Sequence, residues 1–259
     1  MSGHSKWHSI KHKKGLIDAQ RGKIFTRHAN LITIAARKGG DPDMNPSLRF
    51  AIDNAKKDNV PNTNVERAIK RGTGELKGAA EIVEINYEGY GPAGIAVIVE
   101  CLTDNKNRAF TNIRTIFGKS GGNLGESGGV SWMFERKGVI TLNIEDKNPA
   151  FGSEAAQARR DEVELLAIDA GAQDIERDGA LMYVYTAPNN LHAVTENLKK
   201  SGFEPKSAEL QMIPKQTVKI EDEKNAKKVL DFMDTLEEDQ DVNNVYSNFD
   251  ISEELMKKL

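Results

Sequence analysis

The first 20 residues gather side chains that can bind a nucleic acid. A lysine can neutralise a phosphate and release its counterions, a tryptophan can stack on a base or a ribose, and a histidine adds hydrogen-bond donors. A solubilising tail is the alternative, but it has no use for a tryptophan, which could also anchor the segment on the following helices. We predict an arm that contacts nucleic acid through Lys6, Trp7, His8, Lys11, His12, Lys13 and Lys14.

The charge of the chain is unevenly distributed. Residues 1–80 contain 16 lysines and arginines and 7 acidic residues, a net charge of +9. The remaining residues contain 20 basic and 32 acidic side chains, a net charge of −12, so the formal net charge of −3 hides the division. A basic segment attached to an acidic body indicates a polyanionic partner for the basic segment.

Three amphipathic helices are predicted after the arm, and they would position it. Apolar residues recur with helical spacing over residues 21–38. Asn45-Pro46 is typical of the start of a second helix. Thr63 and Glu66 form a capping box for a third helix, which ends at Gly72. Residues 21–72 are therefore predicted to form a small helical domain.

Basic residues of these helices extend the candidate surface. Solvated faces that bind nothing are the alternative, but the excess of basic over acidic residues favours a surface that contacts phosphates. The segments Gly39–Met44 and Asp58–Asn62 are long for a helix-turn-helix, so the sequence does not support base-specific reading of a duplex. The outer helix faces carry Arg27, Arg37, Arg67, Lys70 and Arg71, and the candidate binding residues are Arg21, Lys23, Arg27, Arg67, Lys70 and Arg71.

Strands and helices alternate after residue 80. Residues 139–212 follow a β-α-β-β-α-β order, which is that of a ferredoxin-like unit. The predicted elements outside this unit are strands at 82–87, 95–102, 130–134 and 242–247 and helices at 108–119 and 222–237.

The simplest arrangement of these elements is one α/β domain inserted into another. We expect an arm and helical domain at residues 1–80, a discontinuous α/β domain at 81–136 plus 214–250, and an inserted domain at 137–213. The predicted fold class is α+β, with an N-terminal three-helix domain carrying a basic arm, followed by two ferredoxin-like α/β domains.

Other chemistry finds little support. The single cysteine, Cys101, excludes a disulfide framework and lies in an apolar run. His4, His8 and His12 are four residues apart, but no cysteine or carboxylate joins them as a metal ligand. The glycine-rich stretch 121–129 follows a predicted helix rather than a strand, so it is not a phosphate-binding P-loop.

These absences exclude most enzyme classes. The sequence has no nucleophile elbow, no histidine-glutamate metal motif and no dinucleotide fingerprint. It has no apolar run long enough for a membrane helix and no secretory signal. We predict a cytoplasmic protein that is not an enzyme and has no cofactor, metal, membrane partner or small-molecule substrate.

Seven stretches of the chain carry distinctive motifs: residues 3–7 (GHSKW), 66–72 (ERAIKRG), 87–92 (YEGYGP), 103–108 (TDNKNR), 121–125 (GGNLG), 132–135 (WMFE) and 244–249 (NVYSNF). Together they resemble the motifs of the YebC/PmpR family, which includes the mitochondrial translational activator of cytochrome oxidase. Ala93 stands where many members carry glycine. The resemblance implies three domains, the helical one first, and a regulator of gene expression.

The family label leaves two functions open. The first is a DNA-binding transcriptional regulator, the label commonly given to the family. The second is a ribosome-associated translation factor that binds rRNA or tRNA through the arm, which the mixture of tryptophan, histidine and lysine favours. A protein-interaction scaffold is a third and more remote function. Asp104, Asn105 and Arg108 are expected to cap the helix at 108–119, and the acidic residues 237–241 are expected to form a solvated loop.

Overall fold

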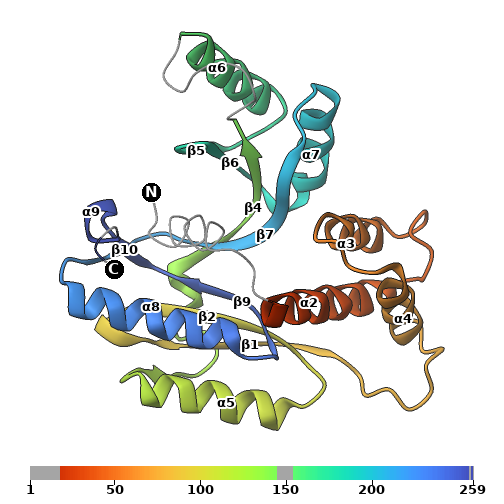
Figure 1. Ribbon diagram of the computed structural model, residues 1–259, viewed down its shortest axis with the longest axis vertical. Helices are drawn as coiled ribbons and strands as arrows, with labels where there is room; N and C mark the ends of the chain where they lie inside the picture. The colour runs from red at the N-terminus through yellow and green to blue at the C-terminus, as the bar shows by residue number, and fades with distance from the viewer. Residues whose placement is uncertain (1–17, 145–153, 257, 259) are drawn as a thin grey trace. The chain divides into compact units, whose positions relative to one another are not determined.

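The computed structural model describes residues 18–144, 154–256 and 258 (Figure 1). The chain divides into two compact units. One unit is Met133–Gln216, and the other comprises the chain on both sides of it, Ser2–Trp132 and Thr217–Leu259. The predicted fold class is confirmed, because helices come first and antiparallel four-stranded sheets follow. We call the larger unit the flanking unit and Met133–Gln216 the inserted unit.

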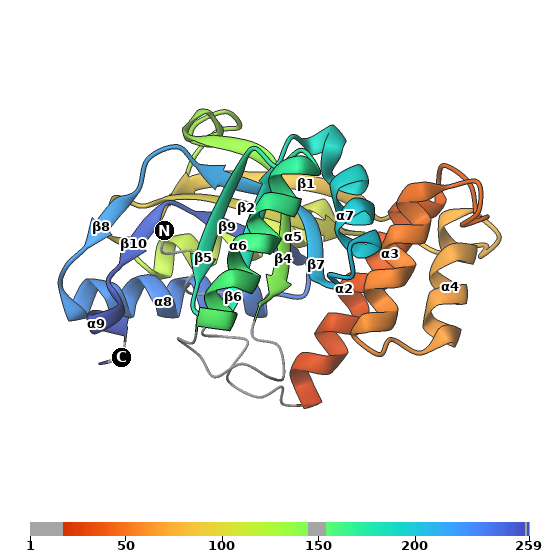
Figure 2. The same ribbon diagram turned by 90° about the horizontal axis from the view of Figure 1, so that it is seen from above.

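A three-helix segment begins the described part of the flanking unit. It consists of α2 (Asp18–Ala36), α3 (Pro46–Lys57) and α4 (Asn62–Gly72), and both later helices pack against α2 (Figure 2). The three predicted helices are confirmed. The side chain of Asn45 accepts a hydrogen bond from the Leu48 N–H at 3.1 Å and so caps α3.

The capping box predicted for the third helix is wrong. Helix α4 begins after Pro61, and no side chain caps its first N–H groups. The helix is instead held by packing, because Val65 and Ala68 are buried with Ile32 and Leu48 in one apolar core. Tertiary burial therefore replaces the local signal as the reason for this helix.

The α/β part of the flanking unit is an antiparallel sheet with two helices against it. The helices meet at Phe117 and Phe232, whose ring centroids are 5.0 Å apart. Ile95, Val97 and Val99 are buried in the same core. The strand order is β3-β1-β2-β9, and the elements are β1 (Val83–Tyr90), β2 (Ala96–Thr103), β3 (Asn123–Leu124), β9 (Val242–Ser247), α5 (Lys106–Lys119) and α8 (Glu223–Glu238).

Short elements connect and close this part. Between β1 and β2, Ala93 has φ +58° in the left-handed region, where a glycine would carry no strain. The other short elements are the helical turns η1 (Pro92–Gly94) and η2 (Ser131–Met133), the parallel pair β8 (Val218–Ile220) and β10 (Phe249–Ile251), and α9 (Glu253–Met256).

The inserted unit has the ferredoxin-like strand order. Its sheet runs β5-β6-β4-β7 with every neighbouring pair antiparallel. Val139, Tyr183 and Tyr185, which come from two neighbouring strands of this sheet, are buried in one apolar cluster. The elements are β4 (Phe134–Asn143), α6 (Glu154–Asp169), β5 (Asp174–Asp178), β6 (Leu181–Thr186), η3 (Pro188–Asn190), α7 (Leu191–Lys200) and β7 (Pro205–Pro214).

The two sheets share one order of corresponding elements. In space, β3, β1, β2 and β9 of the flanking unit correspond to β5, β6, β4 and β7 of the inserted unit. The chain order differs in one respect: β1 comes first in the flanking unit, whereas the corresponding β6 comes third among the strands of the inserted unit. Moving β1 to the position between β3 and α8 would give the flanking unit the β-α-β-β-α-β order as well. The similarity is thus one of architecture with a rearranged chain order.

The strand predicted at 130–134 is wrong. The segment carries the turn Ser131–Met133, and Phe134 begins a single long strand that continues to Asn143. The carboxylate of Glu88 explains the turn, because it is buried and accepts hydrogen bonds from the N–H groups of Gly128, Val130 and Ser131 at 2.9, 2.9 and 2.8 Å. These N–H groups are therefore not available to a strand partner.

The described helices include none whose length and apolar character would allow it to cross a bilayer.

Candidate nucleic-acid interface

The predicted binding residues fall into two groups. The arm residues Lys6, Trp7, His8, Lys11, His12, Lys13 and Lys14, together with His4, lie outside the described residues. The second group belongs to the three-helix segment, which begins at Asp18 and so follows the arm directly. In that group Arg21 lies in α2 without a described side chain, and the others are Lys23, Arg27, Arg67, Lys70 and Arg71.

Arg27 does not point to solvent as expected. Its guanidinium Nε donates to the side-chain oxygen of Asn243 at 3.0 Å, and its Nη2 donates to that of Asn244 at 2.5 Å. Asn244 in turn donates to the carboxylate of Glu100 on β2 at 2.9 Å. The arginine therefore links α2 to strands β9 and β2 of the sheet.

A shallow crevice runs beside this link. Lys23, Arg27 and Asn30 line it from α2, and Leu102 with residues 240–243 line it from the sheet side. Asn30 donates to the carbonyl oxygen of Leu102 at 3.3 Å, which fastens the middle of α2 to the end of β2. Lys23 is half-buried, so this lysine also belongs to the junction rather than to an open face.

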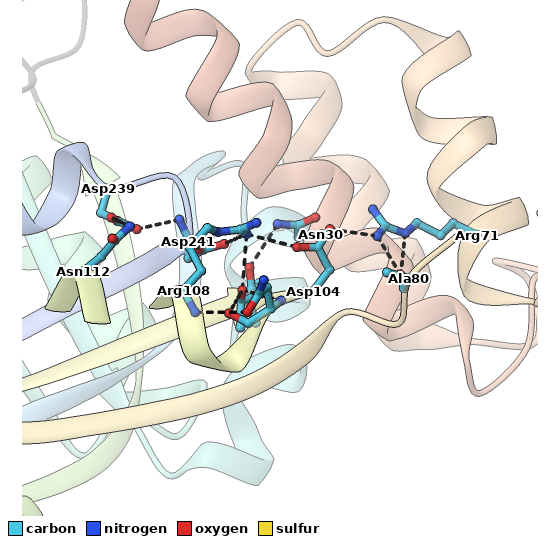
Figure 3. Close-up of polar contacts among 11 residues, drawn as sticks. Asn30, Arg71, Ala80, Asp104, Arg108, Asn112, Asp239 and Asp241 are labelled. Carbon is cyan, nitrogen blue, oxygen red and sulfur yellow. Dashed lines mark hydrogen bonds and ion pairs between the residues drawn. The ribbon is translucent and has the colours of Figure 1, made fainter. Parts of the chain in front are cut away.

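Arg71 and Arg37 fasten the other side of the helices. Arg71 donates to the carbonyl oxygen of Ala80 from Nε at 3.2 Å and from Nη2 at 2.7 Å, and it lies 3.6 Å from the Asp104 carboxylate (Figure 3). Arg37 donates to the carbonyl oxygen of Ile82 and forms an ion pair with Glu81 at 3.1 Å. Both arginines thus hold the chain that leads from α4 into β1.

Arg108 forms the centre of this network. It donates to both oxygens of Asp241, at 2.9 and 2.6 Å, and lies 3.0 Å from Asp104 (Figure 3). Its hydrogen bonds to Asp241 raise the pKa of Arg108 above its ordinary value, although burial opposes the shift. The guanidinium of Arg108 is permanently charged and binds the carboxylate through two parallel hydrogen bonds, which is a common geometry of arginine–carboxylate pairs.

One expectation for this region is confirmed and another is wrong. Asn105 caps α5, because its side-chain oxygen accepts a hydrogen bond from the Arg108 N–H at 3.0 Å. The acidic residues 237–241 are not a solvated loop throughout. Asp241 is only 4% exposed, and Asp239 accepts a hydrogen bond from Asn112 at 2.9 Å. Since the partners lie more than 120 residues away, no local signal could have shown these contacts.

Arg67 and Lys70 remain available to a ligand. Both are exposed on α4, one turn apart on one face. In the part of the chain that the structure describes, neither side chain has a hydrogen bond or an ion pair. Of the predicted helix residues with described side chains, these two are the ones whose position suits phosphate contact.

The described residues contain no candidate metal-binding site. Residues 18–144 and 154–256 contain no group of three histidine, cysteine or acidic side chains that could hold a metal ion. Cys101 is buried, and burial raises the pKa of its thiol to about 12, so the thiol stays protonated. The described site is therefore one of charge and hydrogen bonding.

Comparison with known proteins covers nearly the whole chain. The family model described as the TACO1/YebC protein N-terminal domain matches residues 5–75, and that of the TACO1/YebC second and third domain matches residues 82–249. Proteins of Persephonella marina and Geobacter sulfurreducens, each named probable transcriptional regulatory protein, are 52% and 50% identical over 100% of both chains. A crystal structure of a conserved hypothetical protein from Aquifex aeolicus has 45% identity and a TM-score of 0.83, over 94% of this chain and 96% of that one.

Proposed function

We propose that this protein, which belongs to the TACO1/YebC family, is a regulator of gene expression that binds nucleic acid and catalyses no reaction. The observation that carries the proposal is the charge division, with a net charge of +9 on residues 1–80 and −12 on the remainder. The names of its relatives support a role in regulation. A nucleic-acid target also supports a cytoplasmic location.

The binding surface in this proposal is the arm together with the exposed face of α4. Arg67 and Lys70 are exposed there, and α2 follows the arm without a break in the chain. The contacts of Arg27 and Arg71 fix the helices against the sheet. A basic arm on an acidic body can bind a polyanion while the body limits nonspecific collapse onto it.

DNA is the first target class, because relatives about 50% identical are named as transcriptional regulators. In this form of the proposal the protein binds near promoters and acts on transcription. The lysines of the arm would contact phosphates, which position a protein on DNA without reading its sequence.

An RNA target at the ribosome is the second candidate, and one observation favours it. Arg27, Arg37 and Arg71 contact other parts of the protein, so these three arginines do not supply the positive charge that a polyanion would meet. The arm combines lysines with Trp7 and His8, a mixture that suits irregular RNA with unstacked bases. A translation factor bound to rRNA or tRNA would use it in this way.

In-cell crosslinking separates these candidates. Cells expressing the protein are irradiated, and the nucleic acid that copurifies is sequenced, with the Lys11→Ala/Lys13→Ala/Lys14→Ala variant as the control. Crosslinks concentrated at a few promoters support the DNA regulator, and crosslinks concentrated in rRNA or tRNA support the translation factor. An equal yield of crosslinks from the control variant would contradict binding through the arm.

The same variant gives a quantitative test in vitro. Removing three lysines that contact phosphates should lower the magnitude of the salt slope of binding by about 2–3. An unchanged slope would mean that these lysines do not contact phosphates.

A further inference from the structure

A basic stretch interrupts the acidic α/β part. Residues 105–125 contain four basic side chains and no acidic one, whereas the chain after residue 80 has a net charge of −12. The stretch consists mainly of α5, which packs on the sheet through Ala109, Ile113 and Phe117. The positive charge is therefore carried by a folded helix.

One side of α5 presents an aromatic ring between two cations. Lys106, Phe110 and Arg114 are four residues apart, so they follow each other along one side of the helix, about 6 Å apart along its axis. All three are exposed, and Phe110 retains 43% of its accessible surface. We call these three residues the α5 flank.

Phe110 is held in place without being covered. The Tyr87 ring on β1 lies against it, with 6.1 Å between ring centroids and an angle of 47° between planes. The Tyr87 hydroxyl donates to the carbonyl oxygen of Lys106 at 3.4 Å. The two contacts brace the first turns of α5 against β1, and they leave Phe110 43% exposed.

The cations of the flank differ from the other arginine of the helix. Arg108 is engaged with Asp104 and Asp241. Lys106 and Arg114 have no hydrogen bond or ion pair through their side chains to any residue that the structure describes. On β1 the acidic residues Glu84 and Glu88 occupy the positions that alternate with Tyr87, and so they point to the other face of the sheet.

We propose that the α5 flank is a second contact for nucleic acid, which binds a single strand with one base stacked on Phe110 and phosphates at Lys106 and Arg114. This inference goes beyond the arm and shares with the proposed function only the class of ligand. Proteins that bind single strands combine aromatic platforms with cations that follow the backbone, and this is the composition of the flank.

The flank selects a single strand for a physical reason. A base must expose its face to stack on Phe110, and the bases of an intact duplex are stacked on each other. The flank is also close to the three-helix segment, because Asp104 at the start of α5 lies 3.6 Å from Arg71 at the end of α4.

Equilibrium binding by the full-length protein tests the flank. The probes are single-stranded RNA and DNA oligonucleotides of one mixed sequence and the corresponding duplexes. Phe110→Ala should weaken single-strand binding at least about five-fold, the lower range for the loss of one stacked base. Phe110→Tyr keeps an aromatic face and should bind like the unchanged protein.

A second variant tests the phosphate contacts apart from the stacked base. Lys106→Gln/Arg114→Gln should lower the magnitude of the single-strand salt slope by about 1.4, or about 0.7 for each phosphate. The matched control is Lys227→Gln/Lys228→Gln, which removes the same charge from exposed positions of α8 and should leave the slope unchanged. If Phe110→Ala does not fold, as judged by circular dichroism, the charge variants decide.

The outcomes keep the two proposals apart. Loss of affinity in the flank variants supports the flank. Unchanged affinity in the flank variants, with weak binding by the arm variant, overturns the flank and leaves the proposed function intact. Unchanged affinity in both sets of variants overturns both proposals.

Discussion

Two arginines of the three-helix segment and the two cations of the α5 flank differ in what their side chains contact. In the three-helix segment, Arg27 and Arg71 contact side-chain and backbone oxygens of the α/β part. On the flank, Lys106 and Arg114 are exposed and have no side-chain partner among the described residues. The basic N-terminal region thus uses some of its arginines in contacts within the protein. Helix α5, which belongs to the acidic part of the chain, keeps two cations exposed to solvent.

The comparison shows what charge counting can and cannot do. A net charge describes the field that a partner meets at long range. The role of a single arginine depends on which oxygens lie within hydrogen-bonding distance, and these oxygens often come from distant residues.

Asp241→Ala should cause the largest change, because it removes the buried partner of Arg108. We expect the free energy of unfolding, measured by urea denaturation, to fall by about 2–3 kcal/mol, because charge-assisted hydrogen bonds are lost while the partly exposed guanidinium of Arg108 can still be solvated. The control is Glu84→Ala, which removes an exposed carboxylate from β1 and should change stability by less than about 0.5 kcal/mol. A similar small loss for Asp241→Ala would place Arg108 among the available cations and remove the contrast.

Trp7→Ala tests whether the arm supplies stacking in addition to charge. Affinity for single-stranded or structured RNA should fall by about 1–3 kcal/mol, the range for the loss of one base–aromatic contact. Fluorescence anisotropy measures the affinity, and urea denaturation checks that stability is unchanged. Equal affinity in the variant would reject stacking by Trp7 and favour a role as an anchor.

Glu88 extends the comparison to an internally used anion. Burial alone would raise its pKa, but the N–H groups of Gly128, Val130 and Ser131 outweigh burial and hold the pKa of Glu88 below its ordinary value. Its contribution to stability is therefore present above the unfolded pKa of about 4.3 and is lost as the pH falls through the lower folded pKa.

Glu88→Gln should reveal this dependence. The variant should be less stable than the unchanged protein by about 1.5–2 kcal/mol at neutral pH, since a charged acceptor is lost. The difference should shrink as urea denaturation is repeated at pH values below about 4. A difference independent of pH would show that the charge of Glu88 does not hold the 128–131 segment.

Arg71→Gln and Arg67→Gln should produce the smallest and most informative pair of effects. Arg71→Gln should lower stability by about 1 kcal/mol through lost hydrogen bonds and leave the salt slope unchanged. Arg67→Gln should leave stability unchanged and lower the magnitude of the slope by about 0.7–0.9, the value of one phosphate. The reverse result would show that the structure does not separate internal from available arginines.

Much of the fold was predictable because its signals are local. The Asn45-Pro46 start of α3 and the Asn105 cap of α5 act within three residues of themselves, and both are confirmed. The order of elements at 139–212 also follows from hydrophobic spacing and glycine turns. The strand expected at 130–134 failed because Glu88, more than 40 residues earlier, binds the N–H groups of the segment.

The candidate site was less predictable. The charge of the arm is visible in the composition, and its residues remain predictions because they lie outside the described residues. The roles of Arg27 and Arg71 were hidden, since their partners are side chains of β9, the Asp104 carboxylate and the carbonyl oxygen of Ala80. Phe110 belongs to an amphipathic helix, but its side chain keeps 43% of its accessible surface and lies against Tyr87 of β1, a contact that depends on the neighbouring strand.

Sequence alone determined the helical segment, the inserted α/β architecture and the charge division, because spacing, capping residues and composition act locally or as sums. The tertiary structure decided which charged groups are used internally and which remain exposed. The physical reason is that hydrogen bonds and ion pairs need contact within about 3–4 Å. Contacts such as Arg108 with Asp241, which join residues 133 positions apart, exist only after the chain has folded.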